Sequence, residues 1–231
     1  MALYAMSDLH LSHYKEKPMD IFDEVWHNHT EKIYNNWNNI VSDEDTVIVN
    51  GDLSWGMTME EVKPDLDFIS DLKGRKIIVQ GNHDYFWNST AKLNTLYENM
   101  FFLKNNFTTY ENFAVCGARG WLCPGDTRYT DHDNKIYLRE AGRLRSSVEM
   151  AVKAGYKGEN IIVAMHYPPT NDSCENSLFT ELFNEYKIKR VIYGHLHGAS
   201  KYNNSLEGEV KGIEYFLVSA DYLKFKPIKI I

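Results

Sequence analysis

The chain is short of the features that mark several classes of protein. It has 3 cysteines in 231 residues, and Cys116, Cys123 and Cys174 show no Cys-x-x-Cys spacing. An odd number without that spacing argues against a disulfide framework and against a cysteine-based zinc site. The longest apolar runs, such as 161–165, are too short to cross a bilayer, and residues 1–10 contain no basic stretch leading into an apolar one. We therefore expect a cytoplasmic protein with no membrane partner.

Positive charge is also scarce. The 25 Lys and Arg residues face 32 Asp and Glu residues, which gives a formal net charge of -7. We therefore do not expect the wide basic surface that grips a nucleic acid backbone. With 43% hydrophobic residues the chain can form one substantial core, and its length suits one domain. No repeat or linker divides it, so we predict a single domain over residues 1–231.

Short apolar runs alternate with longer amphipathic stretches, which is typical of a layered α/β fold. Strands are predicted at 3–6, 46–50, 76–80, 101–103, 107–110, 113–117, 160–165 and 190–193, with 213–218 and 223–231 as sheet edges. Helices are predicted at 21–40, from a capping box at 58–61 to 72, at 88–97, around 137–151 and at 177–186. The segment 118–135 lacks periodicity, and a loop of this length inside a compact domain is usually functional or mobile.

Five of the predicted strands stop at a cluster of Asp, Asn or His residues. Ligands of open α/β sheets bind beyond the carboxyl ends of the strands, so side chains that are distant in sequence should meet there. The clusters contain Asp8 and His10, then Asp52, then Asn82 and His83, then His166, and finally His195 and His197.

Imidazoles combined with carboxylates and one carboxamide suit manganese, iron or zinc, whereas calcium or magnesium sites are normally all oxygen. The clusters supply enough ligands for two ions at roughly 3.5–4 Å, a separation that lets two metals stabilise the attacking and leaving oxygens of a phosphoryl displacement. The sequence therefore predicts a two-metal site for phosphoryl chemistry.

The order of these motifs resembles the calcineurin-like metallophosphoesterase family, and in particular its small bacterial phosphohydrolases. The motifs are Asp8-x-His10, Gly51-Asp52, Gly81-Asn82-His83-Asp84, His166 and Gly194-His195-x-His197. The resemblance implies a four-layer α/β/β/α sandwich with mixed sheets and a metal site at the carboxyl ends of the strands. It also implies two divalent ions as cofactors, with Mn²⁺ expected first and Fe or Zn²⁺ as alternatives.

The resemblance further implies a role for each ligand. One metal falls to Asp8, His10 and His197, and the second to Asn82, His166 and His195. Asp52 would bridge the two. The implied nucleophile is a hydroxide shared by both metals, which attacks phosphorus without a covalent enzyme intermediate. His83 would lie over the substrate as a catalytic residue, and Asp84 would orient an imidazole.

The segment 117–145 is locally basic, with six basic and four acidic side chains. Arginine matches phosphate oxygens with a two-pronged donor set, so Arg119 and Arg128 are candidate substrate contacts. Tyr85, directly after the third motif, is a candidate for stacking on a base or sugar. The expected substrate is therefore a small phosphoester, nucleotides included.

The second motif departs from the protein phosphatases of the family, which carry Gly-Asp-x-x-Asp-Arg-Gly. Here Trp55-Gly56 stands where the Asp-Arg pair would be. This favours the branch that holds phosphodiesterases and small-molecule phosphohydrolases. Two alternatives stay open at this point, a metal-dependent nuclease and a non-catalytic metal-binding scaffold of the same fold.

Overall fold

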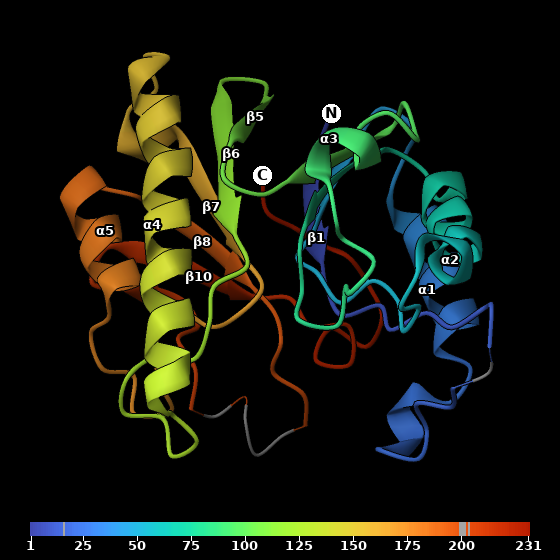
Figure 1. Ribbon diagram of the computed structural model, residues 1–231. Helices are drawn as coiled ribbons and strands as arrows, with labels where there is room; N and C mark the ends of the chain where they lie inside the picture. The colour runs from blue at the N-terminus through green and yellow to red at the C-terminus, as the bar shows by residue number, and fades with distance from the viewer. Residues whose placement is uncertain (16, 199–201, 203) are drawn as a thin grey trace.

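The computed structural model describes residues 1–15, 17–198, 202 and 204–231, and it contains two β-sheets packed face to face between two layers of helices (Figure 1). Helices α1 (His29–Ile40) and α2 (Met59–Asp71) flank one sheet. Helices α4 (Asp131–Lys153) and α5 (Leu178–Tyr186) flank the other. The predicted α/β/β/α sandwich with mixed sheets is confirmed.

The first sheet has five strands in the order β11-β1-β2-β3-β4. Strands β1 to β4 run parallel and β11 is antiparallel to β1. The strands are β1 (Leu3–Met6), β2 (Thr46–Val49), β3 (Arg75–Val79), β4 (Met100–Leu103) and β11 (Ile228–Lys229). Only the last residues of the predicted strand 223–231 are therefore extended, and they do form an edge.

The second sheet has six strands in the order β5-β6-β7-β8-β10-β9. They are β5 (Phe107–Tyr110), β6 (Phe113–Ala118), β7 (Ile161–Met165), β8 (Arg190–Tyr193), β9 (Gly208–Val210) and β10 (Ile213–Leu217). The prediction that 213–218 forms a sheet edge was wrong. Strand β10 lies inside the sheet because the short β9, which the sequence did not reveal, pairs with its outer side.

Helix boundaries differ from the sequence prediction in three places. The helix predicted for 21–40 begins at His29, because Asn28 has a left-handed backbone with φ 52°, and a short 3-10 helix (Glu24–Trp26) precedes it. The helix predicted for 88–97 shortens to α3 (Thr90–Leu93). The loop predicted for 118–135 ends at Thr130, whose capping box starts α4. A 3-10 turn (Gly158–Asn160) precedes β7.

Three apolar layers hold the sandwich together. One lies between the first sheet and α1 and α2, with Trp37 and Leu66 among its members, and one between the second sheet and α4 and α5. The third lies between the sheets and includes Ile48, Ile162 and Ile192. Strands buried on both faces account for the continuous apolar runs in the sequence. Within the part of the chain that the structure describes, no helix has the length and apolar character needed to cross a membrane.

Candidate metal centre

The clusters predicted from the sequence follow the carboxyl ends of five parallel strands. Asp8 and His10 follow β1, Asp52 follows β2, Asn82 and His83 follow β3, His166 follows β7, and His195 and His197 follow β8. The backbone bends sharply at these points, with φ values of 59° at Asp8, 46° at His10, 52° at Asp52 and 70° at His195. Non-glycine residues rarely adopt this left-handed region, and such strain is concentrated at functional sites.

Two motif glycines make room for the carboxylates. A Cβ atom on Gly194 would lie 2.5 Å from Asp8 Oδ2 and closer still to Ser7 Oγ. A Cβ atom on Gly81 would overlap with Asp52 Oδ1. Only glycine therefore lets the backbone of one loop approach the acidic side chain of the next.

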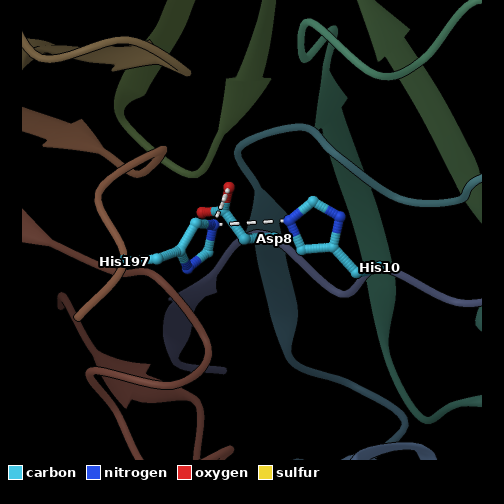
Figure 2. Close-up of side chains that lie close together, drawn as sticks. All are labelled: Asp8, His10 and His197. Atoms are coloured by element: carbon cyan, nitrogen blue, oxygen red, sulfur yellow. Dashed lines mark hydrogen bonds and ion pairs between the residues drawn. The ribbon is translucent and has the colours of Figure 1, made fainter. Parts of the chain in front are cut away.

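Asp8, His10 and His197 form a first group of converging ligand atoms, which Figure 2 shows. His10 Nε2 and His197 Nε2 are 3.3 Å apart, and Asp8 Oδ1 lies 3.4 Å from His197 Nε2. Asp8 Oδ1 is buried and accepts no well-aligned hydrogen bond from the described residues. A buried carboxylate oxygen normally has a partner, so this set of donors fits a cation.

A second group lies beside the first. His166 Nε2 is 2.7 Å from Asn82 Oδ1, 3.1 Å from His195 Nδ1 and 3.4 Å from Asp52 Oδ2. The same Asp52 Oδ2 is 3.9 Å from His10 Nε2 of the first group. The carboxylate thus lies between the two groups, as a shared ligand would.

Hydrogen bonds from Nδ1 fix two of these imidazoles. His166 donates from Nδ1 to the backbone oxygen of Asn50 at 2.8 Å, and His197 donates from Nδ1 to Asp221 Oδ1 at 2.9 Å. Each Nε2 then keeps its lone pair for a metal. Asp221 also accepts from the Gly198 backbone N–H at 3.2 Å and from the Tyr202 hydroxyl at 2.5 Å.

Asp221 and Asn50 are functional candidates that the sequence analysis missed. Asp221 follows β10 as the other clusters follow their strands, so the same strand-end rule was the signal for it. Asn50 follows β2, and its Nδ2 donates to the backbone oxygens of Met165 at 2.7 Å and Ile192 at 3.0 Å. Its side chain therefore joins the first sheet to two strands of the second.

Asp84 makes its hydrogen bonds with backbone groups. Its carboxylate accepts from the backbone N–H groups of Asp52 at 3.1 Å, Leu53 at 2.8 Å and Gly81 at 2.7 Å, and the expected orientation of an imidazole by Asp84 stays a prediction. Burial and the neighbouring Asp52 raise the pKa of Asp84 to about 7. The side chain ties the loop after β2 to the loop after β3, and so places Asp52 next to Asn82.

Burial and mutual proximity shift the proton affinities of the ligand groups. Burial raises the pKa of Asp52 to about 8, and the Asp8 carboxylate adds to this rise. Burial lowers the pKa of His10 well below its usual value. Burial acts the same way on His197, but the Asp8 and Asp221 carboxylates outweigh it and raise the pKa of His197 to about 10. A cation that binds here would displace protons, because metal ligands bind in their deprotonated forms.

His83 lies beside the two groups and is a member of neither. Its ring centroid is 4.5 Å from that of Trp55 and 5.8 Å from that of His10, and its backbone N–H donates to Asp52 Oδ1 at 2.8 Å. Burial, with the charges of His166 and Lys17, lowers the pKa of His83 to about 4. The imidazole is therefore neutral at pH 7.

Two of the predicted substrate contacts are the arginines of the segment between β6 and α4. Arg119 Nη2 is 3.4 Å from Glu140 Oε1, and its guanidinium lies 4.6 Å from the Trp121 ring centroid. Arg128 is 61% exposed, and its Nε is 3.4 Å from Asp126 Oδ1. These arginines are thus held by protein partners.

Tyr167 links the arginines to the second group. Its ring centroid is 4.0 Å from that of His195, and the backbone oxygen of Arg119 accepts from its N–H at 2.9 Å. Burial raises the pKa of the Tyr167 hydroxyl, and the charges of Arg119 and Arg128 oppose that rise. Tyr85 is 55% exposed, with its ring centroid 6.2 Å from that of His83.

Comparison with known proteins gives a consistent result. The sequence model of the calcineurin-like phosphoesterase family matches residues 1–199. The Gene 66 protein of Mycobacterium phage L5 is 37% identical over 79 residues, which are 34% of this chain and 37% of that protein. A probable cyclic nucleotide phosphodiesterase of Ruthia magnifica is 25% identical over 189 residues, which are 77% of this chain and 71% of that protein.

Two solved structures share the fold. The phosphopantetheinyl hydrolase from Mycobacterium tuberculosis superposes with a TM-score of 0.62 at 14% identity, covering 100% of this chain and 95% of that one. A protein of unknown function from Aquifex aeolicus superposes with a TM-score of 0.52 at 17% identity, covering 99% and 95%. At these identities the likeness concerns the architecture alone.

Proposed function

Since the chain belongs to the calcineurin-like phosphoesterase family and is a metal-dependent phosphohydrolase, we propose that it uses two divalent cations to hydrolyse a small phosphodiester. The observation that carries this proposal is the position of Asp52. Its Oδ2 lies 3.4 Å from His166 Nε2 of one ligand group and 3.9 Å from His10 Nε2 of the other. One carboxylate oxygen between two sets of nitrogen ligands suits a pair of metals.

The two groups of converging side chains support a ligand set for each cation. Asp8, His10 and His197 would hold one cation, Asn82, His166 and His195 the other, and Asp52 would contact both. Mixed nitrogen and oxygen donors suit Mn²⁺, which we propose as the working metal, with Fe or Zn²⁺ as alternatives. When bound, the two cations supply Lewis acidity and neutralise charge on the phosphoryl group.

His83 is the proposed catalytic residue outside the metal ligands. It is neutral at pH 7 and therefore carries one ring N–H. Its position beside Trp55 and His10 lets this N–H donate to a phosphoryl oxygen or to the leaving oxygen. The backbone bond from His83 N–H to Asp52 Oδ1 fixes its distance from the shared ligand.

The remaining proposed contacts concern the substrate. The positive charges of Arg119 and Arg128 act on Tyr167, whose ring packs against His195. There they would attract a phosphoryl group. The exposed ring of Tyr85 offers a surface for a base or sugar next to His83. The Ruthia relative, named as a probable cyclic nucleotide phosphodiesterase, supports nucleotides and cyclic phosphodiesters as the first compounds to screen.

The test is to remove metals with a chelator, restore Mn²⁺, and compare turnover of bis(p-nitrophenyl) phosphate with that of p-nitrophenyl phosphate. We expect faster turnover of the diester, lost in Asp52→Asn and retained in Asp43→Asn. Asp43 is a matched control because it is exposed and precedes β2, whereas Asp52 follows it. Faster turnover of the monoester would replace this proposal with a small-molecule phosphatase, and turnover that survives in Asp52→Asn would refute the shared-ligand role.

A further inference from the structure

A cavity of about 450 Å³ opens next to the first ligand group. Its walls are the segment after His10, the turn around Trp55, and the beginning of α2. Trp55 separates the cavity from the metal ligands, since its ring stacks on His10 with centroids 4.9 Å apart and an interplanar angle of 22°. The Trp55 centroid is also 4.5 Å from that of His83. A ligand in this cavity would therefore lie one indole ring away from the reacting group.

The acidic side chains of the cavity are already engaged. Glu61 Oε2 accepts from the backbone N–H groups of Met57 at 2.7 Å and Thr58 at 3.3 Å. Asp65 Oδ1 accepts from the backbone N–H of His13 at 2.9 Å and faces the imidazole Nδ1 of His13 at 2.6 Å, and the Ser54 hydroxyl donates to Oδ2. These carboxylates serve the protein's own backbone and side chains.

The basic side chains of the cavity are exposed. Lys17 places its Nζ 3.4 Å from the Trp55 ring centroid, and Lys15 lines the same cavity. Within the described ranges neither lysine is paired with a carboxylate. Glu61 and Asp65 balance the formal charges of Lys15 and Lys17, but both carboxylates are held in hydrogen bonds within the protein. Among the described lining residues, the charged groups left to contact a ligand are therefore the two lysines.

The cavity walls are fixed before any ligand binds. The Asp65 carboxylate accepts hydrogen bonds from His13, in the segment after His10, and from Ser54, in the turn around Trp55. The Ser54 hydroxyl in turn accepts from the Gly56 N–H at 2.9 Å. The backbone of Leu11 bonds to the opposite wall twice, donating to Leu53 at 3.0 Å and accepting from Trp55 at 2.9 Å. Such preorganisation lowers the entropy that binding costs.

We infer that this cavity receives the part of the substrate beyond the hydrolysed phosphoryl group, and that this part carries a second anionic group, a phosphate or a carboxylate, which Lys17 binds. The inference rests on the proposed function, because it takes the reaction to occur beside Asp52. It narrows the substrate class to phosphoesters with a distal negative charge. Lys17 Nζ, which lies over the Trp55 ring, would move to the anion, and the face of the ring that it leaves would pack against the carbon skeleton between the two anionic groups.

Two diesters that differ only in the distal charge test this inference. Both release p-nitrophenol, and the second aryl group is phenyl in one and 4-carboxyphenyl in the other. With the Mn²⁺-loaded protein we expect kcat/KM to favour the carboxylated ester. In Lys17→Met we expect this preference to fall by about ten-fold, mainly through KM, since a hydrogen-bonded charge pair is lost. Lys153→Met, an exposed lysine at the end of α4, is the matched control and should keep the preference.

The outcomes separate this inference from the proposed function. If the wild-type protein hydrolyses both esters with equal kcat/KM, or if Lys17→Met keeps the preference, the cavity inference is overturned and diester hydrolysis stands. If the wild-type protein hydrolyses neither ester with Mn²⁺ bound, the proposed diesterase function fails and the inference fails with it. If the preference disappears in Lys17→Met and persists in Lys153→Met, the distal anion site is supported. A preference that weakens as NaCl is raised agrees with an ionic contact.

Discussion

Replacing Asp221 by Asn should weaken metal binding at the first ligand group. The two carboxylate oxygens accept three hydrogen bonds, from His197 Nδ1 at 2.9 Å on Oδ1 and from the Gly198 N–H at 3.2 Å and Tyr202 hydroxyl at 2.5 Å on Oδ2. Asparagine has one acceptor oxygen, so it cannot satisfy both sides. It either loses the bond to the imidazole or turns its amide N–H₂ toward the other two donors.

The size of the effect follows from what the imidazole loses. Without a carboxylate on Nδ1 the His197 ring is less basic and less firmly oriented, so its Nε2 is a weaker ligand. Removing such a partner typically costs 10- to 100-fold in metal affinity, which corresponds to about 1.4–2.7 kcal/mol. The second group should keep its affinity, because the Asp221 carboxylate accepts its hydrogen bonds from His197, Gly198 and Tyr202.

Titration of Mn²⁺ against a chromophoric chelator measures both sites in one experiment. We expect the Asp221→Asn protein to show one site with wild-type affinity and one that is weakened. Asp43→Asn, exposed and before β2, serves as the control and should bind as the wild type does. Two sites of unchanged affinity in Asp221→Asn would refute the argument that this carboxylate supports His197.

Two further predictions concern catalysis and packing. His83→Ala should lower kcat by about 10²- to 10⁴-fold, as measured with the chromogenic diester, and should still bind two Mn²⁺ ions, because the ring is outside both ligand groups; unchanged kcat would remove His83 from the mechanism. Gly194→Ala should lower the midpoint of thermal unfolding, because the added Cβ overlaps with Ser7 and Asp8. Gly142→Ala on α4 should raise the free energy of unfolding by about 0.5–1 kcal/mol, because the added Cβ meets nothing within 4 Å. Equal shifts of the two midpoints in thermal unfolding would contradict the packing argument.

The clusters of candidate ligands could be predicted because each is local in the sequence. When a few apolar residues are followed at once by Asp, Asn or His, the sequence itself places that polar residue at the end of a strand. The parallel arrangement then brings the strand ends together. His83 next to Asn82 follows the same logic. The sandwich itself could be predicted from the alternation of strands and helices together with the family resemblance.

The misses have physical causes that lie outside local sequence. Asp221 stands after a strand end as the other candidates do, but it reaches His197 because β10 pairs in parallel with β8, a long-range contact that the sequence analysis did not predict. The hydrogen bonds of Asp84 could not be predicted because its partners are backbone N–H groups of the loop after β2 and of its own loop, which no residue type announces. The helix predicted from residue 21 begins late because Asn28 adopts a left-handed backbone, which apolar spacing does not report.

The candidate ligands of each group come from both sheets, so a bound cation would affect how firmly the two sheets are packed together. In the first group Asp8 and His10 follow β1 of one sheet and His197 follows β8 of the other. In the second group Asp52 and Asn82 come from the first sheet, and His166 and His195 come from the second. A cation held by either group would fasten one sheet to the other. At this edge the Asn50 side chain already connects the two sheets by hydrogen bonds to the backbone oxygens of Met165 and Ile192. If two ions serve hydrolysis as proposed, they would also stabilise the packing of one sheet on the other, and removing them would weaken the contact between the sheets at this edge.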